Sequence, residues 1–415
     1  MSEPAQKFEV VIAGGGLNGL AMAAALAGPA VRMPFNVCIV DGADPKTFSK
    51  PQFDGRASAI TASSRKMLEA LGVWPALADH AEAMREIVIT DSRGAADRRP
   101  ALLHFGEQHS PGTVSAHMVE NSYLYSVLYD VVARSPHVEV MAGHTIDAYD
   151  FGKASTTVSL ARVGRVAGEL LIAADGRNSA ARAAAGVETM GWSYPQAGIT
   201  FTVEHDGDHE GRAEEHFLPA GPFAILPLTG RRSSIVWTEQ SVFAGELMEM
   251  DDDAFQAEFE QRFGTRLGAV RLVSKRFCYP LSLQIAKQFA GDRLALIGDA
   301  AHVVHPIAGL GFNLGLRDIA ALAEVVSDAA RLGLDIGTVD VLERYQTWRR
   351  LDTVMVAAAT DGINRLFSND NSALRSIRDM GLGIVDRAGG LKTVFMREAA
   401  GLSGQLPKLL SGEAL

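Results

Sequence analysis

Two glycines, a proline and a carboxylate follow one short apolar run in the last third of the chain. Leu294 to Gly298 reads LALIG and predicts a buried parallel strand. Asp299 comes next, which puts a carboxylate at the carboxyl end of that strand, where open α/β sheets bind ligands. A loop follows that carries Pro306, Gly309 and Gly311. The pattern predicts a site for a flat, polar-edged ligand.

The chemistry that this loop suits is the binding of an isoalloxazine ring. Gly309 and Gly311 let the backbone approach a flat ligand because no Cβ is in the way. A helix capped by Asn313 or a near neighbour is predicted to follow, and its positive end would stabilise the anion that a flavin becomes after accepting a hydride. Asp299 could accept hydrogen bonds from the ribityl hydroxyls. The apolar positions of the helix fall on one face: Leu316, Ile319, Leu322, Val325 and Val326.

A second glycine pattern stands near the N-terminus. A strand predicted over Phe8–Ala13 runs into Gly14, Gly16 and Gly19, a G-x-G-x-x-G, and then into an alanine-rich helix. Asp41 ends the next predicted strand, 22 residues after Gly19, where such folds place the acid that bonds an adenosine ribose hydroxyl. The pattern predicts dinucleotide binding, although by itself it does not separate NAD from FAD.

Composition excludes several classes of function. The chain has 415 residues, with 39 basic and 49 acidic residues and a net charge of −10, which argues against a nucleic-acid partner and against strong binding to anionic lipid. Cys38 and Cys278 are the only cysteines, so neither a zinc site nor a disulfide framework is expected. The N-terminus lacks the pattern of a signal peptide and no apolar run is long enough to span a bilayer, so a cytoplasmic protein is expected.

The segment GDAAHVVHPIAGLGFNLGLRD resembles the second FAD-binding motif of the flavin-dependent aromatic hydroxylases, which are similar to para-hydroxybenzoate hydroxylase. Within them, it resembles the ubiquinone-biosynthesis hydroxylases. That closer resemblance is carried by His305, Pro306, Ile307, Ala308, Gly309, Gly311, Asn313, Gly315 and Asp318. One position departs, because the family usually has Gln where this chain has Leu310. An amide that could hydrogen-bond near the flavin is therefore missing.

The resemblance implies further contacts to the cofactor, each with a plainer alternative. Arg56 would contact the pyrophosphate or the ring region, or else form a surface salt bridge. Asn121 would be a polar group near the flavin, or else a helix N-cap. Asp175 and Gly176 look like the aspartate–glycine motif linked to FAD and NAD(P)H binding, or else form an ordinary turn. Arg182 would offer positive charge to a cofactor phosphate.

The fold class that the resemblance implies is α/β: a Rossmann-like FAD-binding domain of the aromatic-hydroxylase type, an inserted antiparallel β-sheet substrate domain and C-terminal helices. Helical periodicity fades over 191–282 and β-rich runs replace it. The expected segments are FAD-binding domain over 1–83, 118–190 and 283–338, an excursion into the substrate sheet over 84–117, the β-rich substrate domain over 191–282, and helices with a tail over 339–415. Helices are expected over 17–27, 252–263, 339–361, 361–367 and 374–385, and the charges of the helix over 339–361 are expected to form a solvated face. Residues 84–105 alternate in a strand-like way around a turn over 92–100 and are expected to belong to a second, antiparallel layer.

The activity that the resemblance implies is an FAD-dependent monooxygenase that hydroxylates a polyprenylated phenol in ubiquinone biosynthesis. NAD(P)H would reduce the FAD, O2 would give a C4a-hydroperoxyflavin, and one oxygen atom would go to an activated aromatic carbon while water leaves. The flavin carries this chemistry, so no protein nucleophile is required. Because the substrate is lipidic, peripheral membrane contact or membership of a ubiquinone-biosynthesis protein complex is expected, through the substrate sheet or the C-terminal tail.

His302 and His305 form an H-x-x-H within this segment. The spacing could suggest a metal, but no third ligand clusters with the pair, so no metal is expected. Either ring could instead help to move the phenolic proton of the substrate. The sequence identifies no catalytic base.

Two other functions remain open from the sequence. The first keeps the FAD fold but changes the reaction, to a reductase of prenyl double bonds or to a halogenase, although the W-x-W-x-I-P run of flavin halogenases is absent. The second is a non-catalytic accessory flavoprotein of a quinone-biosynthesis complex, for which Leu310 is the only hint.

Overall fold

The computed structural model describes residues 5–44, 55–91, 101–106, 114, 116–161, 164–309, 311–367 and 405–415.

The strands are β1 Gln6–Ala13, β2 Val37–Asp41, β3 Ala57–Thr61, β4 Ala81–Met84, β5 Glu86–Asp91, β6 Ala101–Gly106, β7 Ala116–Glu120, β8 Val138–Ala142, β9 Ile146–Phe151, β10 Thr156–Leu160, β11 Gly164–Ala173, β12 Thr189–His205, β13 Arg212–Leu218, β14 Gly221–Leu228, β15 Arg232–Gln240, β16 Val270–Leu272, β17 Phe277–Ala286, β18 Ala290–Gly291, β19 Leu294–Leu296 and β20 His302–Val303. The helices are α1 Leu17–Ala27, α3 Ala62–Ala70, α4 Trp74–Leu77, α5 Asn121–Ala133, α6 Ala180–Ala184, α7 Ser241–Glu249, α8 Asp252–Phe263, α9 Gly311–Arg331, α10 Val339–Phe367 and α13 Lys408–Ser411, with 3-10 turns at Ala78–His80, Gly298–Ala300 and Ile307–Gly309.

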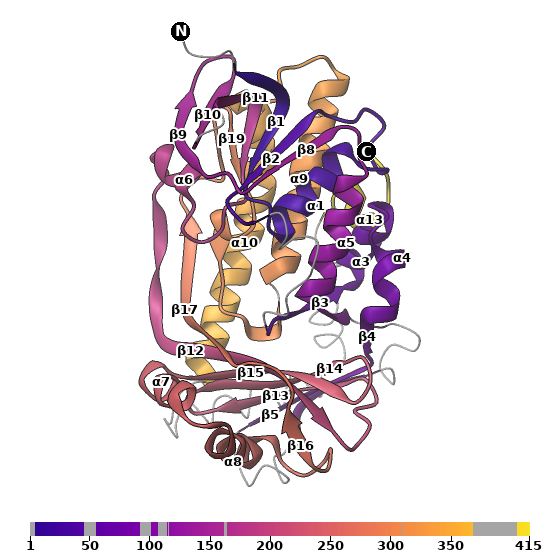
Figure 1. Ribbon diagram of the computed structural model, residues 1–415, viewed down its shortest axis with the longest axis vertical. Helices are drawn as coiled ribbons and strands as arrows, with labels where there is room; N and C mark the ends of the chain where they lie inside the picture. The colour runs from indigo at the N-terminus through magenta and orange to yellow at the C-terminus, as the bar shows by residue number, and fades with distance from the viewer. Residues whose placement is uncertain are drawn as a thin grey trace.

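A parallel sheet forms the first layer of the molecule. Strands β19, β11, β1, β2 and β8 lie side by side in this order and run parallel, while β18 joins the outer edge of β19 antiparallel (Figure 1). The hairpin β9–β10 adds to β11 antiparallel. In β1 the neighbouring residues Val10, Val11 and Ile12 are all buried, as expected for a parallel strand with both faces covered.

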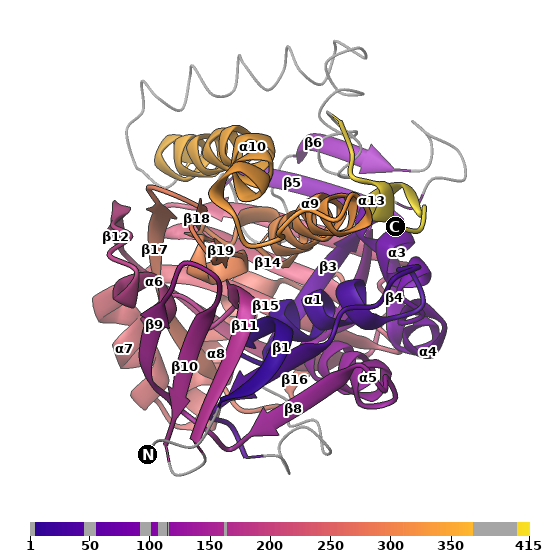
Figure 2. The same ribbon diagram turned by 90° about the horizontal axis from the view of Figure 1, so that it is seen from above.

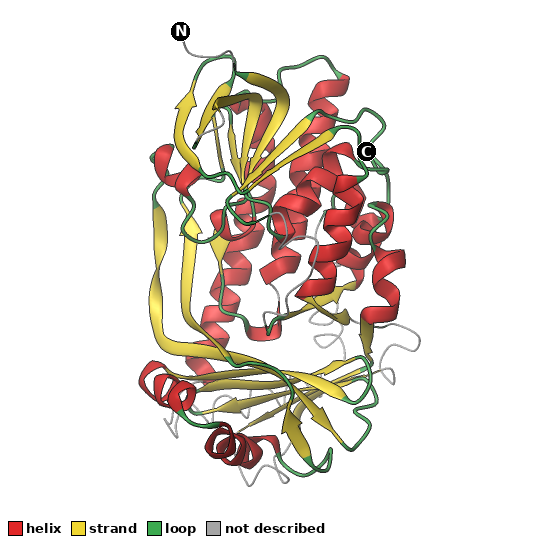
Figure 3. Cartoon of the chain, in the orientation of Figure 1, coloured by secondary structure: helices red, strands yellow, loops and turns green. Residues whose placement is uncertain are grey.

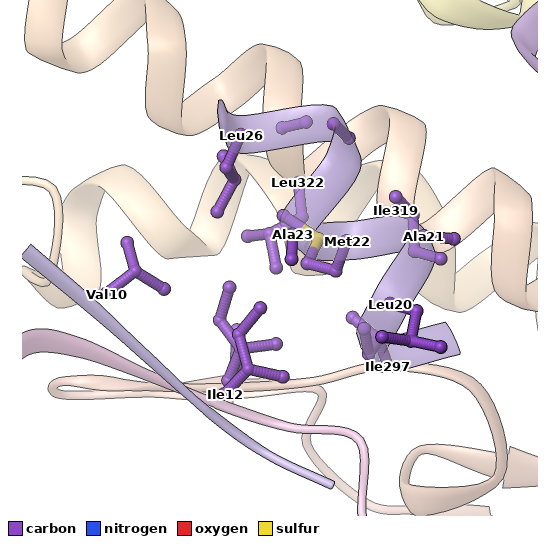
Figure 4. Close-up of a cluster of buried hydrophobic side chains, with 14 of the residues drawn as sticks. Val10, Ile12, Leu20, Ala21, Met22, Ala23, Leu26, Ile297, Ile319 and Leu322 are labelled. Carbon is purple, nitrogen blue, oxygen red and sulfur yellow. The ribbon is translucent and has the colours of Figure 1, made fainter. Parts of the chain in front are cut away.

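Helix α1 packs between this sheet and helix α9. Figure 4 shows Val10 and Ile12 of β1 beside Leu20 of α1 and Ile319 and Leu322 of α9 in one apolar cluster, and all five side chains are buried. Figure 2 shows α9 and then α10 stacked beyond α1 on one side of the parallel sheet. The periodic apolar face predicted for α9 is confirmed, because that face is what packs on α1.

A nine-stranded sheet forms the second layer, below the first in Figure 3. Most of its strands are antiparallel, but β5 runs parallel to β13 and antiparallel to β6. One face is covered by α7 and α8 through Phe201, Trp237 and Phe255, and we call it the outer face. We call the opposite face the inner face.

A small sheet of β3, β7 and β4 joins the two layers. Ala59 of β3 and Met118 of β7 pack with Ala213 of β13 and Leu226 of β14 in one buried cluster. The inner face of the nine-stranded sheet is therefore anchored to the elements that follow the first glycine motif.

Several sequence predictions are confirmed and others need correction. The helices predicted over 17–27 and 252–263 have those bounds in the structure. The predicted second layer over 84–105 is correct for β5 and β6, but its description as antiparallel is wrong for β5, which pairs with β13 in parallel. The predicted turn over 92–100 and the predicted helix over 374–385 lie outside the described residues.

The long helix α10 corrects two expectations. It continues through Asp361 to Phe367, whereas the sequence predicted a break at Asp361. The sequence also predicted that the charges of this helix face solvent, but Arg349 is buried. The reason is a buried carboxylate on α9, which needs a cation from the neighbouring helix.

Candidate active site

Strand register brings three motifs to one edge of the parallel sheet. Ala13 of β1 pairs with Ala173 of β11, and Ala173 pairs with Leu296 of β19. Because these strands are parallel, their carboxyl ends coincide, and each is followed directly by a predicted cofactor motif. Backbone bonds hold the ends together, from the Ala174 N–H to the Ala13 carbonyl at 2.8 Å and from the Ile297 N–H to the Ala173 carbonyl at 3.0 Å.

The nucleotide end of the site is built by β1, α1 and β2. The Asp41 carboxylate accepts hydrogen bonds from the Gly15 N–H at 2.5 Å and the Ala43 N–H at 2.7 Å. The Tyr125 hydroxyl donates to the Gly15 carbonyl at 2.9 Å. These bonds hold the glycine loop against Asp41, and each Asp41 oxygen keeps a second acceptor direction for a ribose hydroxyl.

The three glycines of the first motif have distinct roles in the structure. A Cβ on Gly19 would lie 1.9 Å from the Gly14 carbonyl oxygen, and one on Gly14, which has a φ of +103°, would lie 2.5 Å from the Ala174 carbonyl oxygen. A Cβ on Gly16 would meet nothing within 4 Å. Gly14 and Gly19 are therefore needed for internal packing, while Gly16 borders open space at the start of α1, where a pyrophosphate is expected.

The aspartate–glycine motif lies at the end of β11. One Asp175 oxygen accepts from the Ala181 N–H at 3.1 Å, and the other is buried without a hydrogen-bond partner. Gly176 has a φ of +84°, which explains the glycine. The expected phosphate contact of Arg182 is not what the structure shows, because its buried guanidinium donates to the Ala300 and Arg177 carbonyls at 2.8 Å each. Arg182 instead ties this motif to the turn that carries Asp299.

Asp299 is exposed in the 3-10 turn that follows β19. Its neighbour Gly298 has a φ of +55°, and a Cβ there would lie 2.1 Å from Asn18 Nδ2. A Cβ on Gly315 of α9 would lie 2.2 Å from Asn18 Oδ1. Asn18 therefore fills the junction between the first and second motifs. The sequence analysis missed it, and its position inside G-x-G-x-x-G was the available signal.

The loop after Asp299 ends in helix α9. Pro306 is exposed, Gly309 has a φ of +61°, and a Cβ on Gly311 would meet nothing within 4 Å, so this loop leaves room for a ring. Leu310 lies outside the described residues. The prediction that Asn313 caps the helix is wrong, because α9 already begins at Gly311.

Asn313 instead holds the loop to β3 and α3. Its side-chain oxygen accepts from the Thr61 N–H at 3.1 Å and from the Ser64 hydroxyl at 2.8 Å, and its amide donates to the Ala59 carbonyl at 2.7 Å. All these groups are buried, which fixes the amide orientation. Asn313 therefore positions the loop from behind.

Arg56 and Asn121 are brought together by the pairing of β3 with β7. The Asn121 N–H donates to the Arg56 carbonyl at 3.0 Å, and the Asn121 side chain accepts from the Ser58 hydroxyl at 2.7 Å. The alternative that Asn121 is an N-cap is wrong, because Glu120 holds that position. The Arg56 guanidinium lies 5.6 Å from the ring centre of Tyr279 on β17. Both predicted residues therefore lie where β3 meets the nine-stranded sheet.

A buried carboxylate network fixes the second motif. Asp318 of α9 accepts from the Gly298 N–H at 3.0 Å, pairs with His302 Nε2 at 2.6 Å and pairs with Arg349 Nε at 2.9 Å. Burial would raise the pKa of Asp318, but the charges and hydrogen bonds of His302 and Arg349 outweigh burial and lower it. Asp352 pairs with Arg349 as well. The His302 ring therefore has a structural role as a partner of Asp318. The sequence did not predict that Arg349 is the second partner of this carboxylate.

His305 has a different environment from His302. Its ring is fully buried, and neither ring nitrogen has a hydrogen-bond partner. Burial lowers the pKa of His305 to about 4, with only a small opposing effect of Asp361. The Tyr194 ring packs edge-on at 5.2 Å between centres, and the Tyr194 hydroxyl donates to Asp361 at 2.8 Å. His305 is therefore neutral at physiological pH.

The glycines and carboxylates of the site fit the FAD that the sequence predicts. Gly16 and Gly311 border open space, an Asp175 oxygen lacks a partner, and Asp41 and Asp299 supply acceptors at the two ends. Within the described ranges, no three His, Cys, Asp or Glu side chains are grouped to hold a metal ion. In the same part of the chain, no helix combines the length and apolar character of a membrane span.

Comparison with known proteins agrees with this geometry. Residues 7–354 match the family model described as FAD binding domain. The chain is similar to ubiquinone hydroxylase UbiL of Rhodospirillum rubrum, with 42% identity over 98% of this chain and 93% of that protein. It is 33% identical to 3-demethoxyubiquinol 3-hydroxylase of Escherichia coli over 96% of this chain and 99% of the relative. The human ubiquinone biosynthesis monooxygenase COQ6 is 30% identical over 95% of this chain and 92% of its own length.

Solved structures share the fold at lower identity. The p-nitrophenol 4-monooxygenase PnpA of Pseudomonas putida has a TM-score of 0.79 at 18% identity and covers 96% of this chain and 99% of its own. The anhydrotetracycline hydroxylase OxyS of Streptomyces rimosus has a TM-score of 0.72 at 18% identity, covering 97% of this chain and 77% of its own. These likenesses establish the α/β architecture with a second sheet.

We expect Asp299→Ala to weaken FAD binding by about 10- to 100-fold, the range for losing a hydrogen bond to a charged acceptor. The measurement is the flavin absorbance per protein after dialysis, with FAD titration of the apoprotein. Asp292→Ala is the matched control, because Asp292 is also exposed and lies in the turn before β19. Equal retention of FAD by both variants would remove Asp299 from the site.

We expect Asp318→Asn to lower the free energy of unfolding by about 3–5 kcal/mol, because the buried charge of Arg349 loses its partner. Asp328→Asn, on the same helix but paired with Arg331 at the surface, should cost only about 0–1 kcal/mol. Urea unfolding of the apoproteins measures both. The folded-state pKa of Asp318 is lowered, so its contribution is complete at neutral pH and is lost as pH falls below about 4. A cost that stays constant to lower pH would contradict this assignment.

Proposed function

Because this chain belongs to the FAD-dependent monooxygenases of the ubiquinone-hydroxylase family, we propose that it hydroxylates the ring of a polyprenylated phenol in ubiquinone biosynthesis, with NAD(P)H as the reductant and O2 as the second substrate. One observation carries the proposal. The ends of β1, β11 and β19 present the glycine and carboxylate motifs at one sheet edge, and the inner face of the nine-stranded sheet is anchored next to them.

The protein's contribution is binding, orientation and exclusion of water. When bound, FAD supplies the redox chemistry and the activation of O2. The backbone at Gly16 would receive the pyrophosphate, while Asp41 and Asp299 would receive ribose and ribityl hydroxyls. The N-terminus of α9 offers free N–H groups to the ring edge that becomes negative on reduction. Asn313 and Asp318 hold this helix start in place from the protein side.

The inner face of the nine-stranded sheet suits an aromatic, apolar substrate. Its side chains include Ala224 and Leu226 of β14 and Val236 of β15, and Ala224 is the cross-strand partner of Val236. Small and branched apolar residues leave room for a ring and exclude water from it. By register, Thr200 and Thr202 of β12 and Ser234 of β15 lie on the same face, so hydroxyl groups stand beside the apolar side chains.

We also propose the division into domains expected from the sequence. Residues 1–83, 118–190 and 283–338 form the FAD-binding domain, residues 84–117 and 191–282 form the substrate domain, and residues 339–415 form the helical C-terminal part. Its support is that β5 and β6 pair into the same sheet as β12 to β17.

Product analysis tests the proposed activity directly. We expect the FAD-loaded protein to consume NAD(P)H and O2 in the presence of a short-chain prenylphenol and to form a product 16 mass units heavier. A strain that lacks its own quinone-ring hydroxylases would report the position of the new hydroxyl group. A protein that reduces a prenyl double bond, or one that binds no FAD, would overturn the proposal in favour of a reductase or an accessory subunit.

A lipidic substrate requires access from the bilayer, and we propose that helix α10 provides it. Leu351 and Met355 are 69% and 65% exposed on its outer surface, and Val354 between them is 38% exposed. On β12, which bonds to α10 through Tyr194, Trp192 is also exposed. Exposed apolar side chains on one helix face, with an interfacial tryptophan nearby, suit shallow contact with lipid.

We expect Leu351→Ser with Met355→Ser to reduce binding to phosphatidylcholine vesicles, because less apolar surface would enter the interface. Flotation with vesicles measures this, and hydroxylation of a detergent-dispersed, short-chain phenol should stay unchanged. Neutral vesicles are the appropriate choice because the net charge is −10. Unchanged flotation would contradict lipid contact at this face.

A further inference from the structure

Glu215 is a carboxylate in the middle of the apolar inner face. Successive side chains of strand β13 point to opposite faces of the sheet, so those of Ala213, Glu215 and Phe217 lie on the inner face. Across the strands, Glu215 pairs with Ala224 of β14 and with Ile89 of β5. All four neighbours are uncharged and apolar, and none can donate a side-chain hydrogen bond to the carboxylate.

The adjacent residue shows what a structural carboxylate looks like on this strand. Glu214 points to the outer face, where Arg266 lies at 2.6 Å, Arg212 at 3.2 Å and His216 at 3.3 Å. Burial acts to raise the pKa of Glu214, but these partners outweigh it and lower the pKa to about 2. Among the described residues Glu215 has no such partner, and burial alone raises its pKa to about 7. Two neighbouring glutamates thus have opposite environments.

The strand that carries Glu215 is supported on both sides of this residue. Two residues before it, Ala213 packs on the small sheet with Ala59, and Ala59 lies 3.4 Å from where a Cβ of Gly309 would be. Two residues after it, Phe217 packs on Phe367 of α10 at 4.1 Å between ring centres. Glu215 lies between these two supports, and its side chain is half-buried.

An unpaired carboxylate at this place is costly for folding. Burying a charged group without a partner is unfavourable, and a protein under selection for stability alone would have an apolar residue there. A perturbed carboxyl group on an apolar face next to a cofactor loop is instead typical of acid–base catalysis.

We propose that Glu215 is the base that accepts the phenolic proton of the substrate. The inference rests on the proposed function, because it names the group that would recognise the phenol. The substrate O–H bond breaks, the proton moves to a Glu215 carboxylate oxygen, and the electron pair stays on the phenolate oxygen. The phenolate donates this density to the ring carbons ortho and para to it, which makes them better nucleophiles toward an electrophilic oxygen. No oxidant or reductant is involved in this step.

The assignment also defines a substrate requirement. The site takes an aromatic ring with a free hydroxyl group directed at the inner face of the sheet. The methyl ether of the same phenol has no proton to give, so it would leave the Glu215 carboxylate without a hydrogen-bond donor. Such a mismatch is strongly disfavoured.

The first test compares Glu215→Gln with the wild type in a pH series. We expect kcat of the variant to fall about 100-fold near neutral pH, the usual contribution of a general base. The loss should shrink as pH approaches about 10, where a phenol ionises without help. The variant should also lose the preference for a phenol over its methyl ether in equilibrium binding. Glu246→Gln, an exposed glutamate on α7, is the control with unchanged kcat and pH profile.

The second test needs no activity. Because the folded-state pKa of Glu215 is raised, the ionised group destabilises the fold as pH rises through about 7. Glu215 itself has apolar neighbours on β5 and β14, and on α10 the charges of Asp361 and Arg365 pair with each other at 2.9 Å. The Tm of Glu215→Gln should therefore exceed that of the wild type at pH 8 by more than at pH 5.

The outcomes separate this inference from the proposed function. If the wild-type protein hydroxylates no phenol, the proposed function fails. If it hydroxylates a phenol and Glu215→Gln keeps the wild-type kcat, pH profile and preference over the methyl ether, the assignment of Glu215 fails alone. A Tm difference that is the same at pH 5 and pH 8 would show that Glu215 does not have the apolar environment described above.

Discussion

The site depends on one buried carboxylate, Asp318, which holds two helices and the cofactor loop together. Its oxygens are shared between the Gly298 N–H, the His302 ring and the Arg349 guanidinium, all of them buried. An ionised group in this environment is tolerated only when every partner is in place. The turn that presents Asp299 therefore has one arrangement relative to α9, and that rigidity is what a flavin site requires.

The two sheets contribute different parts of the site. The edge of the parallel sheet supplies acceptors and glycines for a nucleotide cofactor, since parallel strands end together there. The nine-stranded sheet supplies an apolar face, anchored on one side by the small sheet and on the other by α10. Glu215 is a carboxylate on this face, and its cross-strand neighbours Ala224 and Ile89 are apolar.

The parts of the site that could be predicted from the sequence are those carried by short-range patterns. The bounds of α1 follow from the G-x-G-x-x-G pattern, and the positions of Asp41, Asp175 and Asp299 follow from apolar runs that end in a carboxylate. Arg349 and Asn18 were not found, because their roles arise from contact with residues far away in the chain. The same reason explains Asn313, which was expected to cap a helix and instead bonds to β3 and α3.

The sequence by itself determined the chemistry that the chain offers: two glycine motifs, three strand-end carboxylates and a β-rich insertion, since each depends on residues that are neighbours along the chain. Only the tertiary structure decided which groups act together. Strand pairing and helix packing place Ala13, Ala173 and Leu296 in one register. They also turn Glu214 toward arginines and Glu215 toward apolar neighbours on the inner face. The environment of a charge is set by residues distant in sequence, and adjacent identical residues therefore differ in pKa.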